Sequence, residues 1–290
     1  MGGGSFSEAK GRTGALVASD EDAPPIELER KRFWQRGDVG ERLLSVFSPL
    51  LLLVVWEVLV RTGLLDARFF PAPSSIVGTF GNLVASGELL NHVTASIGRI
   101  IVGFVIGAIP ALILGIVMGL SPWVRAAVNP MVAATYPIPK IAILPLIMLI
   151  FGLGEMSKYV IVSIAGFYLI LINTMAGVMN IEKIYLDVGK NFGASRKDTY
   201  LTIALPGSLP MIFAGVRLAW GVSLLVIVAA EFVGAKNGIG YLIWQSWQTF
   251  SVEAMYVGLI VISILGYVSS LILDELERIL IPWKSLHIAT

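Results

Sequence analysis

The chain contains no cysteine and only two histidines among its 290 residues. The missing cysteine excludes disulfide bridges, thiolate metal sites and a cysteine nucleophile. His92 and His287 are far apart in the sequence and are expected near surfaces, so no metal site is predicted. No cluster of serine, histidine and acidic residues indicates a hydrolase, and an enzymatic role is therefore disfavoured.

Charged residues are also scarce, at 14% of the chain, whereas soluble globular proteins carry about 25%. Hydrophobic residues make up 56%, and apolar runs of about 18 residues or more recur along the chain. Strands of a membrane β-barrel would instead alternate apolar and polar residues over about ten positions. The sequence therefore predicts an all-α polytopic membrane protein.

The two ends of the chain are polar. Residues 1–42 lack the short apolar core of a signal peptide and are expected to form a cytoplasmic tail. Its first part, 1–25, is rich in Gly, Ser and acidic residues and is predicted to be disordered. Residues 285–290 are expected to form a short C-terminal tail, which leaves 43–284 as the transmembrane domain.

Six apolar segments are expected to span the membrane. They cover residues 43–61, 95–120, 126–152, 157–179, 209–233 and 254–273. After the first segment, Pro71 and Pro73 stop any helix, and Ser74 and Ser75 can then cap a short amphipathic helix over 74–86. That helix is expected to lie in the membrane interface.

The basic residues predict the orientation of the chain. With the N-terminus inside, 14 lysines and arginines fall in cytoplasmic segments and four in outer loops, namely Arg61, Arg68, Lys158 and Lys236. Cytoplasmic loops of membrane proteins are enriched in Lys and Arg. Both termini and the segment 180–208 are therefore expected on the cytoplasmic side.

A polar segment of about twenty residues, 187–206, separates the fourth and fifth apolar runs. The pattern predicts a helix over 182–192 that ends at Gly193, because glycine accepts the left-handed backbone of a sharp turn. Ser195 is expected to cap a second helix from Arg196, and Pro206 to break the helix before the fifth span. An ordinary cytoplasmic loop that contains a helix is the alternative.

The sequence contains no G-x4-G-K-[ST] phosphate-binding loop. The nearest match, GAKNGIG at 234–240, lacks the Lys-Ser/Thr ending and is expected on the outer face. Any nucleotide hydrolysis that drives this chain must therefore take place on another polypeptide.

The segment 187–206 resembles the cytoplasmic coupling loop, or EAA motif, of ABC importer permeases, with the pattern E-A-A-x3-G-x9-I-x-L-P. The triplet reads Asp187-Val188-Gly189 and is degenerate, whereas the second half is intact. The resemblance implies that this loop contacts an ATPase through a set of coupling residues. They are Asp187, Gly193, Ala194, Ile203, Leu205 and Pro206.

Residues 43–284 also resemble the nitrate/sulfonate/taurine-type permease family. The similar segments run in the family's order, and they are FPAPSSI at 70–76, the Gly-rich 96–125, the proline-rich 136–158 and 210–243. The resemblance implies a type I ABC importer (MetI-like) fold in a bacterial inner membrane. It also implies a homodimer of permeases, two ATPase subunits and a periplasmic or lipid-anchored substrate-binding protein.

For this chain the resemblance implies no bound cofactor, because ATP and Mg²⁺ belong to the partner ATPase, and no nucleic-acid partner. Membrane lipid is the surrounding solvent. The implied substrate is a small anion such as nitrate, bicarbonate, a sulfonate or taurine, moved by alternating access between two copies of the chain. Some relatives carry aromatic acids or pyrimidine precursors, so these substrates remain an alternative.

Several residues within the spans are candidates for the translocation path or its gates. They are Lys140, Pro137, Pro139, Arg217 and Glu231. Ionisable groups at membrane depth usually face a protein interior or an aqueous path. The alternatives are that Lys140 snorkels or pairs with a helix C-terminus near the two prolines, and that Arg217 and Glu231 form inter-helix salt bridges or anchor the helices at the interface. The prolines, with Pro145, are expected to bend the third span.

Two further charges, Glu57 and Arg99, are expected to serve topology and packing, and they could pair with each other if the first two spans pack together. Four glycines of the second span repeat at four-residue spacing and are expected to let another helix approach closely. They are Gly103, Gly107, Gly115 and Gly119. A secondary transporter or channel that does not use ATP is the competing class, but few carboxylates lie within the spans and no inverted repeat is visible.

Overall fold

The computed structural model describes residues 39–283, and within them all regular structure is helical. The predicted all-α class is confirmed. The elements in chain order are α1 (Val39–Arg61), α2 (Pro73–Ala85), α3 (Glu88–Leu120), α4 (Pro122–Thr135), η1 (Lys140–Ile143), α5 (Leu144–Phe151), α6 (Glu155–Met179), α7 (Lys183–Asn191), α8 (Arg196–Asp198), η2 (Thr199–Ala204), α9 (Leu205–Gly234), α10 (Ile239–Gln248) and α11 (Val252–Leu280).

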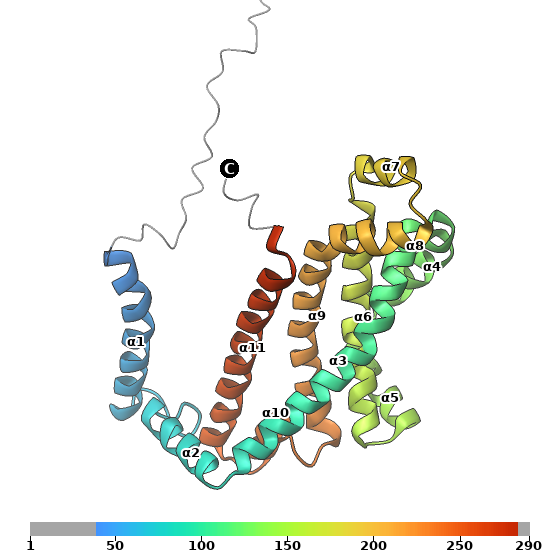
Figure 1. The fold of residues 1–290 in the computed structure, drawn as a ribbon. Helices are drawn as coiled ribbons and strands as arrows, with labels where there is room; N and C mark the ends of the chain where they lie inside the picture. Colours follow the sequence, from blue (N-terminus) through green and yellow to red (C-terminus); the bar gives the residue numbers. More distant parts are fainter. Residues whose placement is uncertain (1–38, 284–290) are drawn as a thin grey trace, which may run out of the picture. The chain divides into compact units, whose positions relative to one another are not determined.

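The described chain divides between Leu52 and Leu53 into two compact units. Helix α1 begins at Val39, inside the segment predicted as a tail. Its apolar side chains from Leu50 to Leu52 are exposed, as expected of a surface that faces lipid. The predictions for residues 1–38 and 284–290 lie outside the described residues. The boundary falls inside α1, and every described element from α2 onward belongs to the second unit. Figure 1 shows these elements as ribbons.

Four helical stretches among the described residues are long and apolar enough to cross a membrane: α3, α6, η2 with α9, and α11. Helix α4 and the η1–α5 segment form a fifth candidate, bent by 84°. The sequence predicted six spans, and its first, 43–61, corresponds to α1. With 33 residues, α3 is about 50 Å long, which exceeds the roughly 30 Å of a bilayer core.

Helices α3 and α6 run parallel and in very close contact. The four predicted glycines of α3 meet α6 in register, with Gly103 against Val162 and Gly119 against Val178. An ideal Cβ placed on Gly107 would lie 2.3 Å from the backbone oxygen of Ser163. The expected role of these glycines in packing is therefore confirmed, because any side chain there would separate the two helices.

Helix α9 runs antiparallel to α6, since Gly177 of α6 lies against Met211 and Gly215 of α9 lies against Asn173. We call the end of the bundle at which α3 and α6 finish and α9 starts the α7 end. The opposite end, where α9 finishes and α10 follows, is the α10 end (Figure 1).

Because α3 and α6 are parallel, the chain must return from the α7 end to the α10 end between them. The bent segment α4–η1–α5 makes this return, and Met148 of α5 reaches Gly234 at the α10 end. Pro137 and Pro139 lie in the gap between α4 and η1, so the predicted bend is confirmed. Pro145 instead occupies the first turn of α5, where proline fits a helix.

The short helix predicted over 74–86 is present as α2, but its serines do not cap it. The N-cap is Ala72, and the carboxylate of Glu57 accepts hydrogen bonds from the Ser74 backbone N–H (3.0 Å) and hydroxyl (2.8 Å). Glu57 also pairs with Arg61 at 2.6 Å. Glu57 therefore does not form the pair with Arg99 that packing of the first two spans would have allowed. Glu57 instead supplies the negative charge that a helix N-terminus favours.

Candidate functional site

The polar segment 182–206 folds as predicted around Gly193. Helix α7 covers Lys183–Asn191, and Gly193 has a left-handed backbone with φ of 75°. Ser195 and Asp198 then cap each other: the Asp198 N–H donates to the Ser195 hydroxyl, which donates to the Asp198 carboxylate at 2.6 Å. These bonds hold the pKa of Asp198 below its usual range, so the cap stays charged at neutral pH.

Helix α7 is attached to the next element through a glycine. Gly189 is buried, and an ideal Cβ on it would lie 2.6 Å from Cδ1 of Ile203 in η2. Gly189 is the third residue of the degenerate triplet, and it is thus in direct contact with Ile203, the isoleucine of the motif. Helix α7 is therefore packed directly on η2, which continues into α9.

This contact predicts size compensation between the two positions. Gly189→Leu is expected to displace α7 and to lower the thermal unfolding temperature of the detergent-solubilised chain, because the added side chain overlaps Ile203. Adding Ile203→Ala to the same chain should restore part of the lost stability. An unfolding temperature that is unchanged in Gly189→Leu, or equally low in the double variant, would show that the two positions do not pack as tightly as the structure indicates.

Pro206 does not break the helix, and that prediction is wrong. Helical hydrogen bonding continues from Thr199 to Gly234. Residues 199–204 form a π-helical turn, and Pro206 lies in the first turn of α9. A π-turn has wider hydrogen-bond spacing than an α-helix, which accommodates the missing N–H of proline. In Figure 1 the ribbon changes direction between the α8 and α9 labels.

The free surface of α7 has two distinct faces. Charged residues follow one side, where Asp187 and Lys190 pair at 3.8 Å. The adjacent side carries exposed apolar residues at helical spacing. They are Ile184, Tyr185, Val188 and Phe192, and Phe192 is 87% exposed.

A groove of about 1090 Å³, which we call the α7 groove, lies between this apolar face and the junction of η2 with α9. Its lining includes Ala194, Ile203, Pro206 and, from the end of the described chain, Trp283. Contiguous apolar surface beside charged residues indicates a protein-interaction site. Among the predicted coupling residues, Asp187 lies on the charged face of α7, and Leu205 begins α9.

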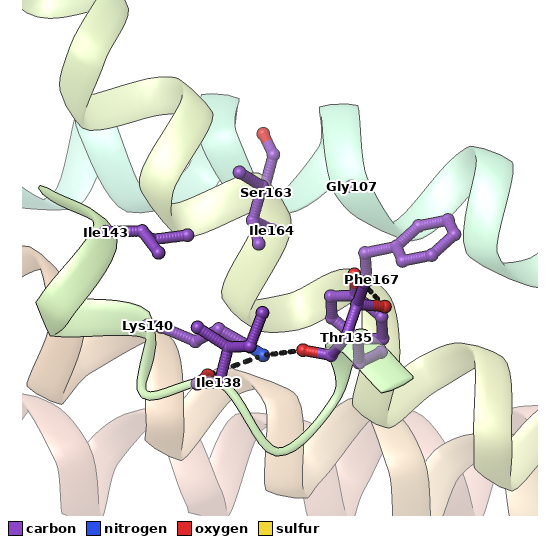
Figure 2. Close-up of a pocket in the computed structure, with 9 residues that line it drawn as sticks. Gly107, Thr135, Ile138, Lys140, Ile143, Ser163, Ile164 and Phe167 are labelled. Carbon is purple, nitrogen blue, oxygen red and sulfur yellow. Dashed lines mark hydrogen bonds between the residues drawn. The ribbon is translucent and has the colours of Figure 1, made fainter. Parts of the chain in front are cut away.

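Lys140 lies at the break between α4 and α5, as Figure 2 shows. Its Nζ donates to the backbone oxygens of Tyr136 (2.8 Å), Ile138 (2.9 Å) and Thr135 (3.4 Å). It also lies 4.4 Å from the ring centre of Tyr168. An ammonium group has three donors. All three therefore point to carbonyls at the end of α4, the geometry of the helix-terminus alternative.

The same lysine lines a pocket of about 390 Å³ with residues of α3 and α6. Gly107, Ser163 and Phe167 form part of its wall (Figure 2). The pocket shows that the broken span borders an open volume. Three backbone oxygens hold the ammonium group of Lys140 in this wall, where its positive charge borders the pocket.

Replacing Lys140 with methionine is expected to lower the thermal unfolding temperature of the detergent-solubilised chain. The loss of the ammonium leaves carbonyls of the α4 terminus without a donor, which costs about 1–3 kcal/mol where such groups are shielded from water. Lys190→Met is the control, because that side chain is 77% exposed. Equal unfolding temperatures of the two variants would contradict a stabilising role for Lys140.

Arg217 of α9 forms an ion pair with α11. Its Nη2 lies 2.6 Å from Asp274 and 2.6 Å from Glu277. The structure thus places Arg217 in the inter-helix salt bridge that the sequence analysis weighed against a gate. Since α9 follows directly from η2, this pair connects the α7 end of the bundle to α11.

Glu231 is fully buried at the α10 end, in the inter-helix salt bridge that the sequence analysis weighed against a gate, although its partners were not predicted. Arg99 of α3 donates to Glu231 at 2.7 Å and to both oxygens of Glu155, at 2.6 and 2.8 Å. The same guanidinium donates to the backbone and side chain of Asn237. Ser96 donates to Glu231 at 2.8 Å, and the Gly240 N–H donates at 2.8 Å. The network joins α3, α6, α9 and α10.

The glycines of 234–240 let the chain wrap around Glu231. An ideal Cβ on Gly238, where φ is 119°, would lie 2.3 Å from the Glu231 carboxylate carbon. The Gly238 N–H donates to Nδ1 of His92 at 3.0 Å. His92 is thus buried and not near a surface as predicted, whereas His287 lies outside the described residues. The segment 234–240, whose sequence partly matches a phosphate-binding loop, thereby encloses the carboxylate of Glu231.

Lys158 was predicted in an outer loop, and that prediction is wrong. The residue lies in α6 with 1% exposure, and its Nζ donates to backbone oxygens of Leu153, Gly154 and Gly234. It connects the start of α6 to the end of α9. Within residues 39–283, no three His, Asp or Glu side chains lie together as metal ligands would.

A family model described as "Binding-protein-dependent transport system inner membrane component" matches residues 111–285. A putative aliphatic sulfonates transport permease protein of Bacillus subtilis is 30% identical over 273 residues, 94% of this chain and 96% of that protein. The taurine transport system permease protein of Escherichia coli is 32% identical, covering 89% of this chain and 96% of its own length. The nitrate import permease protein of Synechococcus elongatus is 27% identical, covering 83% and 92%.

Proposed function

Because this chain belongs to the family of binding-protein-dependent transport system inner membrane components, we propose that it is the membrane-spanning subunit of an ATP-driven importer. It is a multi-pass membrane protein and, in this proposal, forms a solute path through the bacterial inner membrane. ATP and Mg²⁺ bind to a separate ATPase chain, and a periplasmic or lipid-anchored protein delivers the substrate.

The observation that carries the proposal is the geometry of α7. This helix exposes an apolar face to solvent, and its buried Gly189 packs on Ile203, from which helical structure continues into α9. A partner that binds the exposed face and moves would therefore move α9. We assign the α7 end to the cytoplasm, since Lys183, Lys190 and Lys197 lie there and cytoplasmic loops are basic.

We propose that two ATPase subunits bind two copies of this chain and drive alternating access. The break at Pro137 and Pro139 and the pocket beside it support a path wall that can change shape. Lys140 holds that break in its present shape, whereas Arg217 ties α9 to α11 and Glu231 ties α9 to α3. In this scheme all three are positioning residues rather than substrate ligands.

For the substrate we propose a small anion such as a sulfonate, taurine, nitrate or bicarbonate. The names of the similar permeases support this class. The donors of Lys140 are occupied, so specificity is assigned mainly to the binding protein. An aromatic acid or pyrimidine precursor would fit the same architecture. A channel or secondary transporter would not explain why α7 exposes an apolar face.

Reconstitution into proteoliposomes tests the proposal. The chain is combined with a candidate ATPase and a candidate binding protein from the same organism, and uptake of labelled taurine and nitrate is measured with ATP, without ATP and with an ion gradient alone. Uptake that requires ATP and all three components is expected. Uptake driven by the gradient alone, without the ATPase, would contradict the proposal.

A further inference from the structure

The α7 groove has an unusual feature: the last described residue of the chain contributes to its wall. Trp283 lines the groove together with α7 residues such as Tyr185 and Val188, although it follows α11 in the sequence. Ile281, two residues earlier, is only 2% exposed and anchors this end of the chain. The polypeptide therefore leaves the described structure from within the groove.

Seven residues follow Trp283, with the sequence Lys-Ser-Leu-His-Ile-Ala-Thr. Extended chain covers about 3.3 Å per residue, so these residues can reach about 23 Å. The nine-residue helix α7 is about 14 Å long. The segment is therefore long enough to follow the whole length of α7 from its starting point in the groove.

The chemistry of the segment matches that of the groove. Leu286 and Ile288 are two residues apart, so they would lie on the same side of an extended chain. The groove offers apolar side chains for them, among them Ile184 and Val188. It also contains the carboxylates of Glu182 and Asp198, which complement the positive charge of Lys284.

We propose that residues 284–290 of this chain bind in the α7 groove and cover the apolar face of α7 in the absence of a partner. A partner that needs this face must then displace the segment. Binding of the segment is inferred only from the groove and from the length and chemistry of residues 284–290. The competition with an ATPase rests on the proposed function.

Cysteine cross-linking tests the binding, because the natural chain contains no cysteine. The full-length double variant Ile288→Cys with Val188→Cys is oxidised in detergent micelles, and Ile288→Cys with Trp123→Cys is the control. Trp123 lies at the same end of the bundle and is 87% exposed. A disulfide needs Cα atoms within about 7 Å, so only groove binding should join position 288 to position 188.

An intramolecular disulfide that forms at least about tenfold faster in the 188 pair than in the 123 pair is the expected result. Equal rates would overturn the proposal. A disulfide found only between two chains, seen as a band of doubled mass, would also overturn it, because the occupant would then be a second copy.

Truncation at Trp283 tests the competition. If the segment fills the groove nine-tenths of the time, its removal should tighten binding of the partner ATPase about tenfold. Unchanged ATPase affinity together with the 188 disulfide would overturn the competition while the groove binding stands. If neither the full chain nor the truncated chain binds the ATPase, the proposed function fails, and the disulfide result is unaffected.

Discussion

Arg99→Met is expected to destabilise the protein by about 3–5 kcal/mol, because it leaves the buried carboxylate of Glu231 without its charged partner. Glu231 has no exposed surface, and Arg99 is 4% exposed, so water cannot replace the missing bond. Thermal unfolding of the detergent-solubilised chain, followed by circular dichroism, measures the loss. The double variant Arg99→Met with Glu231→Met should recover much of it, since it contains no unpaired buried charge.

The matched control is Arg278→Met. Arg278 also pairs with a carboxylate at 2.6 Å, that of Glu275, but its side chain is 75% exposed. Exposed pairs of this kind contribute about 0–1 kcal/mol. If Arg99→Met and Arg278→Met lowered the unfolding temperature equally, the Arg99 network would not stabilise the α10 end of the bundle.

Gly193→Val is expected to reduce ATP-driven uptake to the background of liposomes without ATP. The φ of 75° at Gly193 belongs to the left-handed region, which costs an ordinary residue about 1–2 kcal/mol and a β-branched residue more. No atom lies within 4 Å of an added Cβ, so the substitution acts on the turn itself. A changed turn alters the direction in which α7 presents its apolar face, and binding of the ATPase should weaken.

Gly87→Val provides a control with the same local geometry. Gly87 also has a φ of 75° and open space around its Cβ, but it precedes α3 at the α10 end. Both variants should lose similar stability, yet only Gly193→Val should lose uptake. Normal uptake by Gly193→Val would argue strongly against α7 as the contact with the motor.

The sequence predicts those features that depend on short-range patterns. Hydrophobic length located the long helices, and the prolines located the break before Lys140. The turn at Gly193 and the cap at Ser195 follow from residue types with strong local preferences, and the structure confirms both. The four-residue spacing of glycines in α3 likewise predicted close packing, although not the partner helix α6.

The sequence could not predict which buried charges pair with each other. Arg99 and Glu231 are 132 positions apart, and their contact depends on how α3 and α9 are arranged in space. The available signal was that both charges lie in apolar segments, where an ionisable group needs a partner. Glu57 offered a nearer partner for Arg99 in the sequence, but the N-terminus of α2 binds that carboxylate instead.

Helix α10 and the continuity at Pro206 were missed for a related reason. Helix α10 has only ten residues, and its sequence follows a glycine-rich loop that reads as irregular. Its buried residues Ile239 and Leu242 pack against α11, so tertiary contacts stabilise it. Proline was read as a helix breaker at 206, whereas its place in the first turn of α9 makes it compatible with the helix.

Site-specific cross-linking from α7 to the ATPase tests the central claim most directly. Phe192→Cys and Trp123→Cys are each labelled with a benzophenone maleimide in the otherwise cysteine-free chain, since both aromatic residues are 87% exposed at the same end of the bundle. After irradiation of the assembled transporter, the probe at 192 is expected to capture the ATPase and the probe at 123 to capture little. Capture at 123 but not at 192 would contradict the account.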